Sequence, residues 1–403
     1  MTVIDPIDDS LETLTVSNFL SIKRAEVDLT NITAIIGPQA SGKSVIAKLF
    51  FFGRTYIERY VTSVFFEDFS VRKFKSEMVS EFSSLFGGLE GFPGLFDIEY
   101  RLGNYSVSVC RETSGGKVKL KHSRDLDAVG RSLSREYLRF RRKASEEEMS
   151  RSRASPFEFR RSSGDLRAFF KSVPSVLFVP ASRSFYATIS EELFTFLASD
   201  ERVDPLTAQF GSFYEFAKRR IGGGLFGEAP SKKAQAHRKS ILQPVIQGDF
   251  VRVKSRDFIE TRWGRVPLRS ASSGQQEALP LLFSLLEYPN PSEPNQLLIV
   301  EEPEAHLFPD AQKYILDLMV HTANANVCDV LFTTHSPYVL ACMNNHIAKA
   351  KSSNGDGFIG SIGAYLTDKG TSKSIVDDDD FVDTNFLDSV SESIAAEFLS
   401  EVE

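Results

Sequence analysis

The sequence is poor in cysteine, and it has no long apolar run and no excess of positive charge. Its three cysteines, Cys110, Cys328 and Cys342, lie far apart and in no spacing typical of a metal or redox site, so we expect a reducing, cytoplasmic environment. No stretch approaches about 18 consecutive apolar residues, so we predict no membrane span. The acidic segment 1–12 has no apolar core and predicts no signal peptide. A net charge of -7 argues against a chain that coats nucleic acid along its whole surface.

The remaining composition is that of a globular protein. Apolar residues make up 42% and charged residues 25% of the 403 positions, which is sufficient for a sizeable core. This length predicts two or three domain-sized units. Residues 13–16 and 25–29 alternate polar and apolar side chains, and with the apolar run 32–36 they predict a small sheet near the N-terminus.

The most informative stretch has the form G-x-x-x-x-G-K-[ST], the P-loop pattern. It consists of Gly37, Pro38, Gln39, Ala40, Ser41, Gly42, Lys43 and Ser44. A predicted strand precedes it and a predicted helix follows it, which is the context the motif needs. Lys43 would reach the β- and γ-phosphates of a nucleotide, and the Ser44 hydroxyl would bind Mg²⁺. The alternative is a chance glycine-rich turn, but the four fixed positions would arise by accident in about 1% of such chains.

Two later strands end in polar side chains that suit phosphoryl transfer. The apolar run 297–300 is followed by Glu301 and Glu302, which a buried parallel strand would present at its carboxyl end. Hydrolysis needs one group near the metal and another that orients the attacking water, and we assign these tasks to Glu301 and Glu302 respectively. The run 330–334 is followed by His335, which we expect to contact the γ-phosphate or the attacking water. A charged turn and a structural histidine are the alternatives.

A small polar loop lies between the P-loop and these strands, and it consists of Ser272, Ser273, Gly274 and Gln275. It precedes a predicted helix, and a glycine-containing loop at a helix N-terminus can bind an anion through its free N–H groups. The alternative is a plain serine N-cap. The loop is therefore a second candidate phosphate contact.

The segment 117–171 reverses the charge of the chain, with 16 Lys/Arg against 8 Asp/Glu. It overlaps the end of three strand-like runs within residues 96–122, which predict an antiparallel meander. One face of a predicted helix carries basic residues four apart, namely Arg131, Arg135 and Arg139. The region Arg131–Lys143 is a hypothetical surface for DNA or an acidic partner, and a solvated helix face is the alternative.

Together these motifs resemble the ABC-type ATPases, specifically the branch of SMC, RecF and OLD proteins. The loop Gly37–Ser44 is similar to Walker A, the run ending in Glu302 to Walker B, the loop Ser272–Gln275 to the ABC signature, and His335 to the switch histidine. The blocks 301–309 and 334–337 are especially similar to OLD-like and RecF-like ATPases.

The resemblance implies an α/β P-loop NTPase with an ABC-type nucleotide-binding head. A mixed sheet flanked by helices is expected, with an antiparallel β subdomain and helical inserts. The head would comprise residues 1–55 and 172–403, with a helical insert at about 185–245. Residues 56–171 would form an insert with the β-meander and the basic helical segment.

The sequence departs from the ABC pattern at three points. Ser273 replaces the glycine usual in transporter signatures. Glu301 replaces the usual metal-side aspartate, so its contact to Mg²⁺ would run through water. No Q-loop glutamine is evident, and Arg183, after the predicted strand 176–179, lies nearest its place.

In this branch two heads meet head to tail around ATP and Mg²⁺, so the resemblance implies a homodimer or higher homo-oligomer in which each signature completes the site of another copy. OLD nucleases carry a C-terminal Toprim domain, whereas the only acidic run in the C-terminal part of this sequence is Asp377–Asp380, which we interpret as a solvated turn and not as a metal site. We therefore expect a separate effector protein, for example a nuclease, as in the anti-phage systems PARIS and Septu and in retrons. The main alternative is a RecF-like DNA-repair clamp. A transporter subunit and a non-hydrolysing scaffold are further alternatives.

Overall fold

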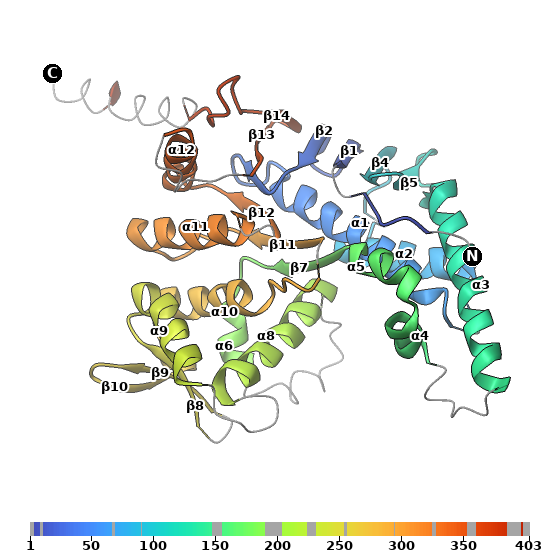
Figure 1. Ribbon diagram of the computed structural model, residues 1–403. Coiled ribbons are helices and arrows are strands. Elements are labelled where there is room, and N and C mark those ends of the chain that lie inside the picture. Colours follow the sequence, from blue (N-terminus) through green and yellow to red (C-terminus); the bar gives the residue numbers. More distant parts are fainter. Residues whose placement is uncertain are drawn as a thin grey trace.

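The computed structural model contains one large mixed sheet with helices on both faces and a small second sheet at one end (Figure 1). This is the mixed α/β architecture that the sequence predicts. The structure describes residues 4–8, 11–66, 69–89, 91–146, 155–189, 204–223, 231–253, 256–293, 295–324, 328–352, 360–384 and 396–397.

One half of the large sheet is parallel, in the order β13–β3–β12–β11–β7. Its strands are β3 (Ile32–Ile36), β7 (Ser175–Val179), β11 (Gln296–Glu301), β12 (Asp329–Thr334) and β13 (Ile362–Asp368). They are apolar runs because helices cover both faces of a parallel sheet. In register, Thr334 lies beside Ile36 and Thr333 lies beside Glu301. The three segments that follow β3, β11 and β12 therefore meet at one edge of the sheet.

The other half is largely antiparallel, in the order β6–β5–β4–β1–β2. Its strands are β1 (Glu12–Phe19), β2 (Ile22–Leu29), β4 (Phe96–Leu102), β5 (Tyr105–Arg111) and β6 (Lys119–His122), and β14 (Thr371–Ser374) connects β2 to β13. Side chains of β4 and β5 alternate between buried and more exposed positions because one face carries the core. The predicted meander is present, and it continues the large sheet because β4 pairs with β1.

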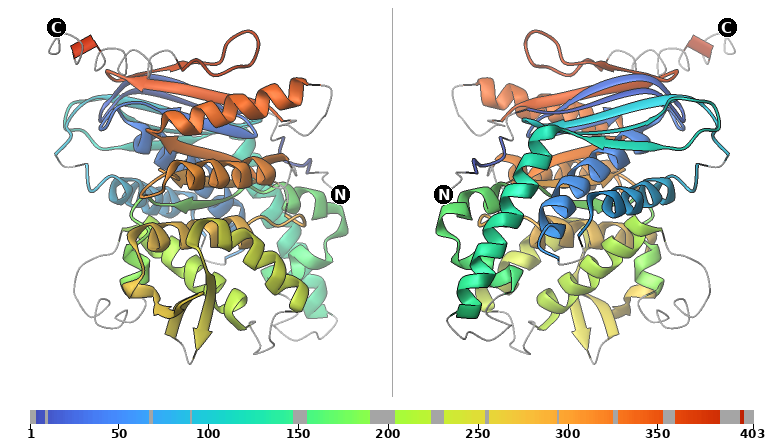
Figure 2. Two further views of the ribbon diagram at one scale, coloured as in Figure 1. Left: turned by 90° about the vertical axis from the view of Figure 1, so that its left-hand side faces the viewer. Right: turned by 90° about the vertical axis from the view of Figure 1, so that its right-hand side faces the viewer.

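Alternate side chains of the parallel strands supply two hydrophobic cores. Leu297 and Ile299 belong to one core, whereas Leu298 and Val300 belong to the other. The first core contains α1 (Lys43–Ser63), α2 (Val71–Leu85), α3 (Arg124–Glu146), α4 (Pro156–Ser162) and α5 (Arg167–Ser172). The second core contains α6 (Phe185–Ile189), α8 (Pro205–Gly223), α9 (Lys232–Ile246), α10 (Ser273–Glu287), α11 (Pro309–Asn324), α12 (Pro337–Lys351) and the small sheet of β8 (Asp249–Val253), β9 (Arg256–Thr261) and β10 (Gly264–Pro267). Figure 2 shows these two groups of helices on opposite sides of the sheet.

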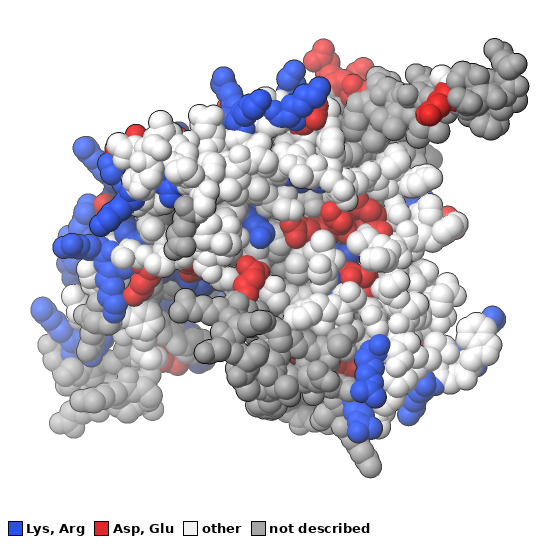
Figure 3. All heavy atoms as spheres, turned by 180° about the vertical axis from the view of Figure 1, so that it is seen from behind, with Lys and Arg blue, Asp and Glu red and all other residues white. Residues whose placement is uncertain are grey.

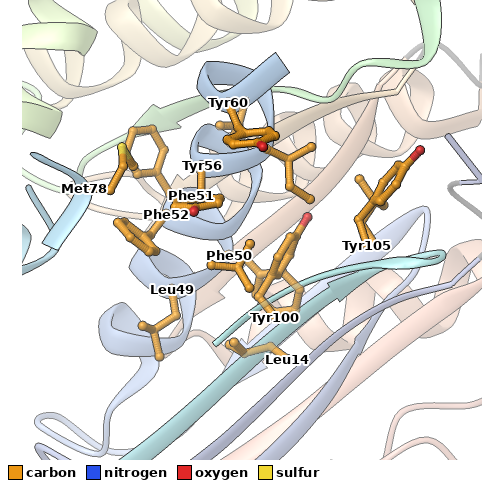
Figure 4. Packing of buried hydrophobic residues seen from close by; sticks show 14 of the residues in the cluster. Leu14, Leu49, Phe50, Phe51, Phe52, Tyr56, Tyr60, Met78, Tyr100 and Tyr105 are labelled. Atoms are coloured by element: carbon orange, nitrogen blue, oxygen red, sulfur yellow. The ribbon is translucent and has the colours of Figure 1, made fainter. Parts of the chain in front are cut away.

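Helix α1, which follows the P-loop, is fixed by aromatic packing and by a buried ion pair. Figure 4 shows its aromatic side chains next to Tyr100 of β4. A Cβ atom at Gly53 would lie 2.2 Å from the Tyr100 ring, so only glycine permits this approach. At the next residue, the Arg54 guanidinium is 2.5 Å from the Glu12 carboxylate, and both side chains are almost fully buried. These contacts hold α1, and with it the P-loop, against the sheet.

Two expectations extend beyond what the structure describes. The predicted helical insert at 185–245 contains α6, α8 and α9, but residues 190–203 and 224–230 lie outside the described residues. The predicted basic helix is α3, and residues 147–154 after it also lie outside the described residues. None of the described helices is long and apolar enough to cross a membrane.

Candidate active site

The P-loop connects the end of β3 to the start of α1, and its conformation requires glycine. Gly37 and Gly42 have φ angles of 156° and 110°, a region that side chains other than hydrogen disfavour. A Cβ atom at Gly37 would lie 2.1 Å from the carbonyl oxygen of Thr367 in β13, the neighbouring strand. The glycines therefore let the loop curl tightly between β13 and α1, as a phosphate-binding loop must.

Lys43 lies folded over this loop. Its Nζ donates hydrogen bonds to the carbonyl oxygens of Gly37 and Pro38, both at 2.8 Å, and is 3.5 Å from His335 Nδ1. Burial lowers the pKa of Lys43, and the negative charges of Glu302 and Glu304 oppose that shift. The ammonium group is thus placed where phosphate oxygens could replace its present carbonyl partners.

Glu302 and His335 meet because β11 and β12 are parallel neighbours. Glu302 follows β11 with a positive φ of 44°, and its N–H donates to the carbonyl oxygen of Thr333 at 3.0 Å. Its Oε1 is 3.2 Å from His335 Nε2, and the two side chains are 40% and 32% exposed, so solvent can reach them. Lys43, His335 and Glu302 therefore form one continuous row of polar groups at the edge of the sheet.

Glu304 completes this row, although the sequence reasoning assigned it no role. Its Oε1 accepts hydrogen bonds from the Thr334 hydroxyl and from the His335 N–H, both at 2.7 Å. Its Oε2 is buried without a hydrogen-bond partner among the described residues. In the sequence, Glu304 could have been noticed as the third carboxylate of the run Glu301-Glu302-Pro303-Glu304. Glu304 orients the strand end that carries His335.

Arg183, after β7, has no exposed surface and ties three elements together. Its guanidinium donates to the carbonyl oxygens of Glu301 (2.7 Å), Glu302 (3.0 Å) and Glu277 (2.9 Å). The Glu277 carboxylate of α10 in turn accepts the N–H groups of Arg183 and Ser184. Burial lowers the pKa of Arg183, and surrounding carboxylates oppose this. The side chain therefore links the backbone of Glu301 and Glu302 to α10, whose first turn contains Ser273–Gln275.

Replacing Arg183 tests this link. Arg183→Met would leave the buried Glu277 carboxylate without its counter-charge and the carbonyl oxygens of Glu277, Glu301 and Glu302 without their guanidinium donor, so we expect a loss of roughly 3–5 kcal/mol in the free energy of unfolding. Adding Glu277→Leu removes the stranded charge, and the double variant should lose less than the sum of the two single variants. Denaturant unfolding of the four proteins measures this, and additive losses would show that the two residues do not act as a pair.

The loop Ser272–Gln275 is a capped and accessible helix start. Ser272 caps α10 in a capping box with Gln275, so the serine N-cap that was the alternative interpretation of this loop is present. Ser272 and Ser273 are exposed. Gln275 Nε2 donates to the carbonyl oxygen of Ile246 at 2.7 Å, and a Cβ atom at Gly274 would lie 2.9 Å from the carbonyl oxygen of His306. Within the described part of the chain, no hydrogen bond joins this loop to the P-loop.

Among the described residues, no hydrogen bond or ion pair joins the side chains of the two predicted metal-side residues, Ser44 and Glu301, to Lys43, His335 or Glu302. Ser44 is exposed at the first turn of α1, beside a hollow of about 750 Å³ that Leu20, Lys48 and Phe86 also line. Glu301 is half-buried, and its carbonyl oxygen accepts from Arg183. Among the described residues no group of three or more His, Cys, Asp or Glu side chains could hold a metal ion by itself. The Ser44 hydroxyl and the Glu301 carboxylate are oxygen donors, which suit Mg²⁺ together with phosphate oxygens and water.

The fold and the P-loop of residues 37–44 define an α/β P-loop NTPase. Residues 32–341 match the family described as "AAA domain, putative AbiEii toxin, Type IV TA system". The match covers well over half of the chain, so the chain belongs to this AAA-domain family, whose P-loop architecture is that of an ATPase.

Solved structures with a similar arrangement are SMC heads. One is the SmcHead bound to the C-winged helix domain of ScpA, with 14% identity, a TM-score of 0.43, and coverage of 91% of this chain and 96% of that chain. Another is the Smc head domain with an extended coiled coil bound to the C-terminal domain of ScpA from Pyrococcus furiosus, with 13% identity, a TM-score of 0.38, and coverage of 96% of this chain and 99% of that chain. A third is the SMC head domain from Thermotoga maritima, with 16% identity, a TM-score of 0.34, and coverage of 91% of this chain and 98% of that chain. No curated protein matches the chain.

Proposed function

We propose that this protein is a cytoplasmic ATPase that binds ATP with Mg²⁺ at the P-loop and hydrolyses it. The observation that carries the proposal is the row of Lys43, His335 and Glu302, which three separate parallel strands bring to one edge of the sheet. A purely structural row of polar groups at this place would not need the buried, loop-bound ammonium group of Lys43.

The proposal assigns a role to each residue of the candidate site. Lys43 neutralises the terminal phosphates, and the main-chain N–H groups of residues 37–44 bind their oxygens. Ser44 and Glu301 would hold Mg²⁺, Glu301 through water. Glu302 orients and deprotonates the attacking water, and His335, held by Glu304, contacts the γ-phosphate. The hollow beside Ser44 would take the nucleoside part.

We further propose that two copies close around the nucleotide, so that Ser272, Ser273, Gly274 and Gln275 of one copy contact ATP bound to the other. Two observations support this arrangement. The loop is exposed, and its hydrogen bonds lead away from the P-loop of its own chain.

Ser272→Arg tests the closure. The bulky cation would stand where the second copy must approach, so ATP binding should remain while ATP-dependent dimers disappear and hydrolysis falls about tenfold or more. Analytical ultracentrifugation with and without ATP measures this. Ser292→Arg, which makes the same change at an exposed position after α10, is the matched control. Normal ATP-dependent dimers of Ser272→Arg would refute the two-copy site.

The proposed biological role is anti-phage defence, in which the ATPase holds or releases a separate effector, such as a nuclease. The family description, with its reference to a toxin of a type IV system, supports a role of this kind. The identity of the protein that co-purifies with this chain tests it. An effector that leaves upon ATP hydrolysis would agree with the proposal, and a chain that never retains a second protein would contradict it.

The alternative is a RecF-like DNA-binding ATPase, and one observation favours it. Arg131, Arg135 and Arg139 are exposed on α3, and Figure 3 shows Lys and Arg side chains along the side of the molecule that carries α3, β4 and β5. Retention of DNA that needs ATP, weakens with salt and disappears when Arg135 and Arg139 are changed to Glu would favour this alternative.

A further inference from the structure

A cationic groove lies away from the P-loop, between α2 and the strands β5 and β6. It encloses about 780 Å³, which is within the size range of small-ligand pockets. Helix α2 contributes Lys75 and three serine hydroxyls, and the opposite wall contributes Arg111 and Lys117. No carboxylate lines it among the described residues. The groove therefore concentrates positive charge and hydrogen-bond donors in a chain whose net charge is -7.

Arg111 gives this groove a buried cation that the surrounding backbone holds in place. Its side chain is more than nine-tenths buried, and its two terminal nitrogens donate to the carbonyl oxygens of Phe92 and Leu89. The guanidinium lies over the Phe96 ring, 5.5 Å from the ring centre. Its Nε is buried without a partner among the described residues. The protein thus holds a cation in a fixed position with one donor unused.

The floor of the groove is apolar. Val79 of α2, Leu89 and Phe92 before β4, and Val118 beside β6 supply it. Cations and hydroxyls on the walls suit a phosphate group, and an apolar, partly aromatic floor suits a planar base. We propose that this groove binds a nucleotide other than the P-loop ATP, with its phosphate on Lys75, Arg111 and Lys117 and its base on the floor. The nucleotide is either free or the phosphorylated end of a single strand.

The groove shares a wall with the hollow beside Ser44. Ser83 and Leu89 line the groove, whereas the residues between them, 84–88, line the hollow. Ser83 holds this short segment together, because its hydroxyl accepts the Leu89 N–H and its carbonyl oxygen accepts the Gly88 N–H. A ligand that displaces Ser83 and Leu89 would therefore also displace residues 84–88, which line the hollow beside the proposed ATP site. This regulation rests on the proposed ATPase function, whereas binding in the groove does not.

Binding is tested on the full chain carrying Lys43→Ala, so that the P-loop does not contribute. The probes are AMP and a 5′-phosphorylated single-stranded DNA of four nucleotides, titrated by calorimetry. Adding Lys75→Ser and Lys117→Ser should weaken the binding of the successful probe about tenfold or more and reduce its dependence on salt, because two phosphate contacts are lost. The matched control is Lys119→Ser with Lys121→Ser, which removes two cations that contact Glu112 instead.

Each outcome decides the proposal. Binding of AMP that needs Lys75 and Lys117 identifies a free nucleotide, and binding of the DNA probe alone identifies a strand end. The proposal is overturned if neither probe binds, or if both double variants weaken binding equally. In the protein with an intact P-loop, the successful probe should change the KM for ATP, and Lys75→Ser with Lys117→Ser should remove that change. A probe that binds without changing KM would overturn the regulation but leave the binding site.

Discussion

Lys43→Ala should abolish ATP binding. The substitution removes the ammonium group that now contacts Gly37 and Pro38 and that would neutralise the terminal phosphates, so we expect the Kd for ATP to rise about 100-fold or more. Calorimetric titration with ATP and Mg²⁺ measures it, and circular dichroism shows that the variant is folded. Lys313→Ala, at an exposed lysine of α11 that pairs with Asp317, is the matched control and should bind normally. An unchanged Kd in Lys43→Ala would mean that the loop is not the nucleotide site.

Glu302→Gln should separate ATP binding from hydrolysis. The amide keeps the size of the side chain and a hydrogen-bond partner for His335, but it cannot accept a proton from water, so we expect kcat to fall by about 10²- to 10⁴-fold with little change in the Kd for ATP. The ATP-bound dimer should consequently accumulate, which size-exclusion chromatography detects. Phosphate release measures kcat.

Glu260→Gln provides the control for this change, because Glu260 pairs with Arg265 on the small sheet, away from the row of Lys43, His335 and Glu302. If Glu302→Gln hydrolysed ATP at the normal rate, the base would have to be another group, and Glu304 would be the first candidate to replace. If both binding and hydrolysis were lost, Glu302 would serve to hold the nucleotide.

Much of the fold could be predicted because its signals are local. The strand–loop–helix around Gly37–Ser44, the apolar run 297–300 of β11 and the alternating β4 and β5 each depend on residues close in sequence, and all have the expected form. The pairing of β4 with β1, which joins the meander to the large sheet, depends on residues about 85 positions apart, and no local pattern encodes it.

The candidate site shows the same division. Lys43, Glu302 and His335 were recognisable because each stands at the end of a predicted strand or in a fixed spacing. Arg183 and Glu277 were not recognised as a pair, because they lie 94 residues apart and nothing in either neighbourhood indicates the other. Glu304 was visible as a carboxylate, but its hold on His335 depends on β11 and β12 lying side by side.

The sequence by itself therefore determined that this protein has a P-loop, with glycines where the backbone requires them and charged side chains after buried strands. Only the tertiary structure decided which of those side chains meet. Parallel pairing places the carboxyl ends of β3, β12 and β11 at one edge, so that Lys43, His335 and Glu302 form a row, while the Ser272–Gln275 loop remains exposed. The physical reason is that hydrogen-bonded register and burial act between residues hundreds of positions apart, whereas a motif records only its own neighbours.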